Sequence, residues 1–154
     1  MKNQLLLIAI FIFVFLMLKN NIRKKVYTIQ DAENAIKYAA QKYGKPFAKQ
    51  FEQLLRLETN HFRSDQYINT GTGGMMIGAW GNRFKKAKVK PQGVWETIKN
   101  GKKYAYVVLG SVKDFADVLF SYLKDHDISE WNGGEMPDYK QRLEKISTPI
   151  TDKL

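Results

Sequence analysis

Apolar residues recur every three or four positions after the N-terminal segment, and this spacing predicts two helices. Thr28 and Asp31 have the spacing of a capping box, so the first helix begins there and runs to Tyr43. A glycine ends it, and Pro46 occupies the first turn of a second helix that continues to about Asn60. The apolar stripe of the first helix consists of Ala32, Ala35, Ile36, Ala39, Ala40 and Tyr43.

Regular patterning fades between residues 61 and 93, where glycines indicate an irregular, turn-rich loop. These glycines are Gly71, Gly73, Gly74, Gly78 and Gly81. A basic run follows them, made of Arg83, Lys85, Lys86, Lys88 and Lys90. The run is interpreted either as a solvated loop or as a contact surface for an anionic polymer.

Residues 93–109 are rich in β-formers on both sides of Asn100-Gly101, which predicts a β-hairpin with a two-residue turn. In that register Glu96 faces Ala105, and Trp95 shares the other face with Tyr106. A second capping box, at Ser111 and Asp114, opens a helix that runs through Asp125. A short last helix is predicted for residues 138–146.

The first 25 residues have a different pattern. Residues 5–18 are fourteen consecutive apolar residues, and as a helix they span about 21 Å. With the flanking positions they predict a membrane anchor over residues 4–19, within an N-terminal unit 1–25 ahead of a domain 26–154. A cleaved signal peptide is the alternative, although a basic stretch replaces the small residues of a cleavage site. The side of the membrane stays open, because the basic residues after the apolar run favour a cytoplasmic domain and an extracytoplasmic enzyme requires the opposite.

Composition narrows the classes of function. The net charge is +10, of which the N-terminal 25 residues carry half, and the remaining +5 is too dispersed to indicate nucleic-acid binding. It suits a protein that works near an anionic polymer or a membrane surface. The absence of cysteine excludes disulfides, thiol nucleophiles and Cys-ligated zinc. With only His61 and His126, a histidine-rich metal site is excluded, and we expect neither metal nor cofactor.

Glu58 interrupts the apolar face of the second predicted helix. At about 100° per residue it falls in the middle of the stripe that Phe51, Leu54 and Leu55 form. A carboxyl group there must leave water, which raises its pKa unless a partner compensates. Such groups concentrate at active sites, but a satisfied structural acid or an exposed last helical turn explains the pattern as well. On the other sides of the helix the wheel places Lys49, Glu52, Gln53 and Arg56.

The segment 54–66, Leu-Leu-Arg-Leu-Glu-Thr-Asn-His-Phe-Arg-Ser-Asp-Gln, resembles a motif of the bacterial and phage glucosaminidase family. This family of peptidoglycan-cutting enzymes, of the mannosyl-glycoprotein endo-β-N-acetylglucosaminidase type, belongs to the lysozyme-like superfamily. Residues 96–123 and 138–143 resemble its hairpin, Ser-capped helix and closing helix. Residues 68–78 replace its Asn-Asn-Leu-Phe-Gly-like loop, and Leu109 stands where the family has a tyrosine.

The resemblance implies an α+β, mostly α, lysozyme-like domain with a small β-hairpin lobe, preceded by the N-terminal transmembrane helix. It implies a peptidoglycan hydrolase that cleaves a β-1,4 bond between N-acetyl sugars, with Glu58 as the general acid and Glu96 as the second carboxylate. Asp65 is another candidate for the second role, and a lytic transglycosylase needs Glu58 alone. The aromatic residues that could stack on sugars, each with core packing as its alternative role, are Tyr67, Trp80, Trp95, Tyr104 and Tyr106.

The expected partner is therefore the glycan strand of peptidoglycan, together with a membrane through residues 4–19, and not nucleic acid. The expected location is a cell envelope or a viral membrane. Two other classes of function stay open. One is a non-enzymatic wall-binding or virion structural protein that keeps the fold. The other is a module that binds anionic lipid through Lys85, Lys86, Lys88 and Lys90.

Overall fold

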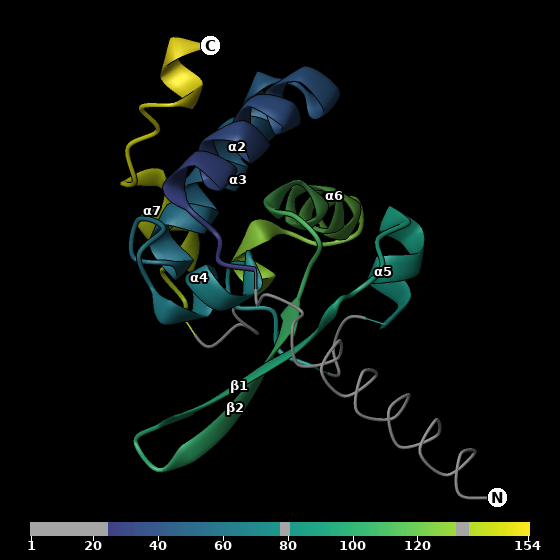
Figure 1. Cartoon of the computed structure of the whole chain (residues 1–154). Helices are drawn as coiled ribbons and strands as arrows, with labels where there is room; N and C mark the ends of the chain where they lie inside the picture. The colour runs from purple at the N-terminus through teal and green to yellow at the C-terminus, as the bar shows by residue number, and fades with distance from the viewer. Residues whose placement is uncertain (1–24, 78–80, 132–135) are drawn as a thin grey trace, which may run out of the picture.

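Helices form the body of the molecule, and a β-hairpin extends from one end of it (Figure 1). The structure is a computed structural model that describes residues 25–77, 81–131 and 136–154. Within these ranges it contains six α-helices, two short 3-10 helices and a two-stranded antiparallel sheet. This content of helices and strands agrees with the α+β, mostly α, part of the predicted fold class.

The first two predicted helices are confirmed. Helix α2 (Ile29–Tyr43) begins with the Thr28–Asp31 capping box, in which each side chain accepts a hydrogen bond from the other residue's backbone N–H. Gly44, with φ of +91°, separates it from α3 (Lys45–Glu58). The two helices pack on each other, and their buried apolar side chains form a large part of the hydrophobic core.

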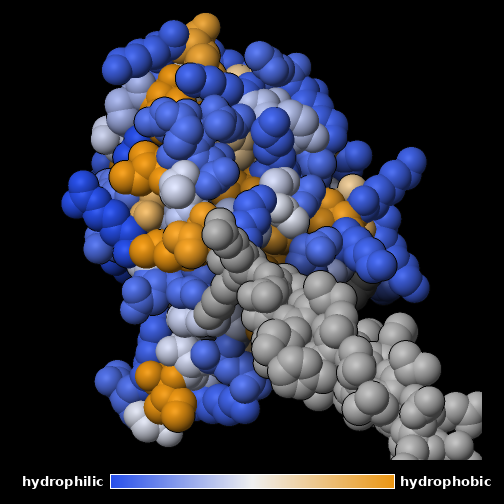
Figure 2. All heavy atoms as spheres, in the orientation of Figure 1, coloured by the Kyte–Doolittle hydropathy of each residue, from blue (hydrophilic) through white to orange (hydrophobic). Residues whose placement is uncertain are grey.

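Helix α6 (Val112–Leu123) begins as predicted, with Ser111 and Asp114 as a capping box, and ends two residues before the predicted Asp125. It packs against α2 and brings Phe115 to the core, where its ring centroid lies 5.6 Å from that of Phe51 on α3. The helices thus bury their apolar stripes against one another. On the face shown in Figure 2 the surface is mostly hydrophilic, with apolar side chains in separate small spots.

The hairpin prediction is confirmed in its register. Strands β1 (Gly93–Lys99) and β2 (Lys102–Val108) pair so that Glu96 faces Ala105 and Trp95 faces Tyr106. Asn100 and Gly101 have φ of +51° and +73°, as a tight primed turn requires. Residues 75–77 lie along the other edge of β2. The N–H of Val107 donates to the Met75 carbonyl at 2.9 Å, and the N–H of Ile77 donates to the Ala105 carbonyl at 3.1 Å, so three backbone segments lie side by side in this part of the lobe.

Four short elements were not predicted. They are α4 (Asp65–Thr70), α5 (Gly81–Ala87) and two 3-10 helices, η1 (Ile128–Glu130) and η2 (Thr151–Lys153). Helix α7 (Tyr139–Glu144) is shorter than the predicted 138–146. Each spans at most two turns, too few to show an apolar periodicity. They are stabilised by local caps, such as Ser64 at the start of α4, and by contacts with distant parts of the chain.

The membrane prediction requires a correction. No helix in the described ranges is long and apolar enough to cross a bilayer. The longest, α2, has 15 residues, whereas a spanning helix needs about 20 apolar ones. The predicted anchor, residues 4–19 of the unit 1–25, lies outside the described residues. The fold class that the described residues support is therefore α+β, mostly α, and the transmembrane helix and the single-pass, membrane-anchored location are not supported.

Candidate active site

Glu58 is the last residue of α3 and remains partly buried there. The preceding turn is held in the core by Leu54 and Leu55, which are fully buried. The helix ends two residues earlier than predicted, yet its last turn is covered rather than exposed. Glu58 also lies at the negative end of the helix dipole, which disfavours a further negative charge.

A tight turn directly follows Glu58. Asn60, His61 and Phe62 have φ of +47°, +56° and +69°, a left-handed conformation that residues other than glycine rarely adopt three times in succession. The buried Thr59 side chain stabilises this turn, because its hydroxyl donates to the Leu55 carbonyl and accepts from the backbone N–H of Phe62. Strain of this kind is found at functional sites. Here it turns the chain away immediately after the carboxyl group.

Tyr139 of α7 is the hydrogen-bond partner of Glu58. Its phenol donates to Oε1 at 2.5 Å across 81 residues of sequence, and its ring is 1% exposed. Burial raises the pKa of Glu58, while the Tyr139 hydrogen bond and the positive charge of Arg142 lower it; the net pKa is above the ordinary value. The carboxyl group is therefore shifted towards the protonated form that a general acid needs.

The glycine loop passes directly over this carboxyl group. A Cβ at Gly74, which has φ of +88°, would lie 3.5 Å from the second oxygen of Glu58, Oε2. A Cβ at Gly73 would lie only 3.1 Å from Leu54 and 3.2 Å from Phe115, so the loop is packed tightly on α3 and α6. Among the described residues, none donates a hydrogen bond to Oε2. The described residues therefore leave the hydrogen-bonding capacity of this oxygen unused.

From Gly74 the chain continues into residues 75–77 beside β2 and so joins the site to the hairpin. Met76 pairs with Tyr106, whose pKa is raised by burial and, to a smaller extent, by Tyr104 and by the negative charge of Glu58. Trp95, across the hairpin, and Tyr104, on the same strand, each stack with Tyr106, and their ring centroids are 5.9 and 6.2 Å from its own. Three of the five predicted sugar-binding aromatics thus form one cluster near Glu58, in which Tyr106 is buried and Trp95 and Tyr104 are half-buried.

The other predicted site residues lie elsewhere. Tyr67 is fully buried and its hydroxyl donates to the Thr28 carbonyl at 2.7 Å, so it belongs to the core. Trp80 lies outside the described residues. Glu96 is exposed and paired with Lys103 at 2.9 Å, on the face of the hairpin opposite Tyr106, because neighbouring strand residues alternate between faces. Asp65 is exposed in the first turn of α4.

A second acid on α3 was missed. Glu52 is completely buried, although the helical wheel places it away from the apolar stripe. Its carboxylate accepts hydrogen bonds from Arg56 Nε, from the backbone N–H groups of Ile150 and Thr151, and from the Thr151 hydroxyl, at 2.8–3.2 Å. The C-terminal segment covers this side of α3, which only the tertiary structure reveals. Glu52 is thus a fully satisfied structural acid, in contrast to Glu58.

The basic run is partly neutralised within the chain. Arg83 and Lys86 of α5 pair with Asp125 at 3.4 and 2.8 Å, which leaves Lys85, Lys88 and Lys90 exposed. In the part of the chain that the structure describes, no three side chains of the metal-binding types come together. The chemistry available at Glu58 is therefore proton transfer by a single carboxyl group beside an aromatic surface.

Comparison of the chain with protein-family models, with curated proteins and with solved structures finds no match.

Proposed function

We propose that this protein cleaves the glycan strands of peptidoglycan, with Glu58 as the general acid. The observation that carries the proposal is the state of Glu58. It is a partly buried carboxyl with a raised pKa; one oxygen accepts a hydrogen bond from Tyr139, and the other, beside Gly74, accepts none from a described residue. The resemblance of residues 54–66 to the glucosaminidase motif gives the substrate class.

The chemistry requires a proton donor because a sugar alkoxide is a poor leaving group. In the proposed reaction the protonated Glu58 gives its proton to the glycosidic oxygen as the bond to the anomeric carbon breaks. Tyr139 holds the carboxyl group in one orientation through Oε1, so that Oε2 carries the proton towards the substrate. The half-buried Trp95 and Tyr104, which stack on the buried Tyr106, supply flat apolar area for sugar rings.

The position of Glu96 supports a second candidate, a lytic transglycosylase. A hydrolase of the two-carboxylate type needs both acids on either side of the same bond. Glu96, however, is on the opposite face of the hairpin from Tyr106 and is paired with Lys103. In the transglycosylase route Glu58 first protonates the leaving oxygen and then accepts the proton of the substrate's own attacking hydroxyl. One carboxyl group is then sufficient.

Mass spectrometry of muropeptides released from purified peptidoglycan tests the proposal and separates the two routes. Hydrolysis adds water to the product, whereas transglycosylation gives an anhydro sugar that lacks it. Under the two-carboxylate route Glu96→Gln abolishes product formation, and under the single-acid route it leaves product formation intact. If wild-type protein releases no muropeptide of either kind, the proposed function is wrong.

A further inference from the structure

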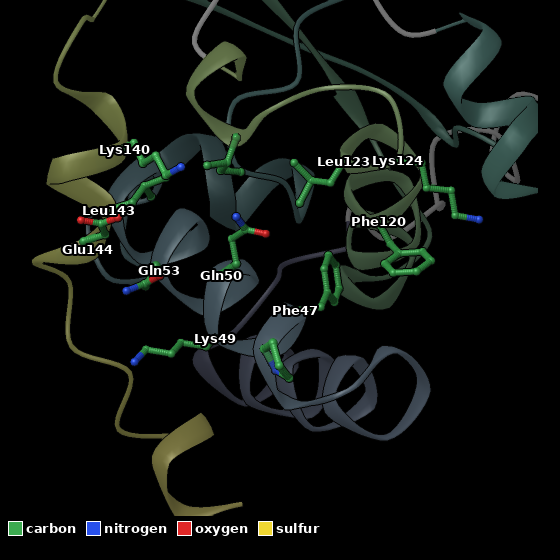
Figure 3. Close-up of a pocket in the computed structure, with 12 residues that line it drawn as sticks. Phe47, Lys49, Gln50, Gln53, Phe120, Leu123, Lys124, Lys140, Leu143 and Glu144 are labelled. Atoms are coloured by element: carbon green, nitrogen blue, oxygen red, sulfur yellow. The ribbon is translucent and has the colours of Figure 1, made fainter.

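One opening on the helical side of the molecule is separate from Glu58. A cavity of about 470 Å³ lies between α3, α6, η1 and α7 (Figure 3). Its volume is in the range of pockets that bind small ligands. Neither Glu58 nor any residue of the hairpin lines it.

The floor of this cavity is apolar. Phe47, Ile128 and Leu143 lie almost fully buried at its base, and the half-buried Phe120 and Leu123 continue the apolar surface towards solvent. In Figure 3 Phe47 and Phe120 stand on one side and Leu143 on the other. Such a floor accommodates one bulky apolar group.

Positive charge surrounds the opening. The lining contains Lys49 of α3, Lys140 of α7 and Lys124, which directly follows α6; Glu144 is the one acid among the described lining residues. Lys140 lies 3.8 Å from Asp127, whereas Lys49 and Lys124 form no ion pair with any described residue, and the Lys124 ammonium lies 5.1 Å from the centroid of the Phe120 ring. Ammonium groups that lack a carboxylate partner beside an apolar floor favour a ligand that carries carboxylates next to an apolar group.

Two glutamine amides complete the lining. Gln50 stands between the aromatic side and the Lys140 side in Figure 3, and no described residue hydrogen-bonds its side chain. Gln53 is 9% exposed and donates only a long bond, 3.4 Å, to the Ile146 carbonyl. Side-chain amides both donate and accept, and so match the N–H and C=O groups of a peptide backbone. An acyl chain offers no such groups, and a polyanion does not use the apolar floor.

From these features we infer that the cavity binds a short acidic peptide with one bulky apolar side chain. The apolar side chain enters between Phe47 and Leu143, its backbone meets Gln50 and Gln53, and flanking carboxylates meet Lys49 and Lys124. This site is independent of the chemistry at Glu58.

Isothermal titration calorimetry of the full-length chain with a capped glutamate–phenylalanine–glutamate tripeptide tests the inference. We expect a dissociation constant below about 1 mM. The corresponding lysine–phenylalanine–lysine and glutamate–serine–glutamate peptides should not bind. The inference is overturned if the acidic peptide does not bind, or if either control peptide binds equally well.

Matched variants locate the binding. Lys49→Gln with Lys124→Gln should weaken binding about fivefold, whereas Lys88→Gln with Lys90→Gln, which makes the same change of net charge elsewhere, should change it less than about twofold. Gln50→Glu keeps the size of the side chain and puts a negative charge at the centre, so it should weaken binding further. Equal losses in both double variants, or no loss with Gln50→Glu, would place the peptide elsewhere and refute the site.

Glu58→Gln should leave peptide binding unchanged. A failure of peptide binding is therefore distinct from a failure of the proposed glycosidase activity.

Discussion

The phenol of Tyr139 donates a hydrogen bond to Glu58 at 2.5 Å and thereby joins the last turn of α3 to the short helix α7. One carboxyl oxygen is fixed by this bond, and the other faces Gly74. The bond also adjusts the chemistry, because it stabilises the charged form of Glu58 against the effect of burial.

Removal of this hydrogen bond should move the pH dependence of activity. Tyr139→Phe keeps the ring but withdraws the contribution that lowers the Glu58 pKa, so the pKa rises. A general acid is active while protonated, and its activity is lost as the pH rises through its pKa. We therefore expect the alkaline limb of the rate profile for muropeptide release to move to higher pH. A limb that stays in place or moves to lower pH would show that Tyr139 does not act on this proton.

Glu58 should also make stability depend on pH. Its pKa in the folded protein is above the value of 4.5 for an exposed glutamate. Its contribution to the free energy of unfolding is therefore fully present below pH 4.5 and is lost as the pH rises through the raised pKa. Glu58→Gln removes this loss and keeps an oxygen for Tyr139. In urea unfolding, the variant should gain stability relative to wild type as the pH increases from acid to neutral. A constant difference across that range would contradict the raised pKa.

The two acids Glu52 and Glu96 should differ sharply in their effect on stability. Glu52→Ala leaves Arg56 and the N–H groups of η2 without their buried acceptor, at a cost of about 3–5 kcal/mol. Glu96→Ala removes only an exposed pair with Lys103 and should cost less than about 1 kcal/mol. Chemical denaturation of the two variants measures both values. Similar costs would mean that η2 does not depend on Glu52.

Gly71 and Gly101 provide a matched test of packing in the glycine loop. Both have left-handed φ, of +70° and +73°, so alanine strains the backbone equally at either position. Only at Gly71 would the new Cβ meet another group, the Tyr27 ring at 2.7 Å, whereas nothing lies within 4 Å at Gly101. Gly71→Ala should therefore cost about 1–3 kcal/mol more than Gly101→Ala in the free energy of unfolding. Equal costs would show that the loop relaxes around residue 71.

The parts of the fold that could be predicted from sequence are those with a local signal. The capping boxes at Thr28 and Ser111 and the Asn100-Gly101 turn each determine an element through contacts a few residues apart. The inward position of Glu58 followed from helical periodicity in the same way. Its partner, however, is 81 residues away, and no local pattern connects it to Tyr139.

The same reason explains the errors at the site. The helical wheel assumes one buried face, but α3 is covered on a second side by the C-terminal segment, and Glu52 is buried there. Tyr67 has the amphipathic character of a sugar-binding residue, and only the packing of α4 shows that its ring belongs to the core. The hairpin register was predicted, and with it the separation of Glu96 from Tyr106 onto opposite faces.

The most direct test of the central claim is the rate of muropeptide release by Glu58→Gln compared with wild type. Glu33→Gln, the same chemical change on α2, serves as the control. We expect Glu58→Gln to reduce the rate by about 10²–10⁴-fold while thermal unfolding shows an intact fold, and the control to keep the wild-type rate. A folded Glu58→Gln variant that releases muropeptides at the wild-type rate would contradict the assignment of Glu58 as the general acid.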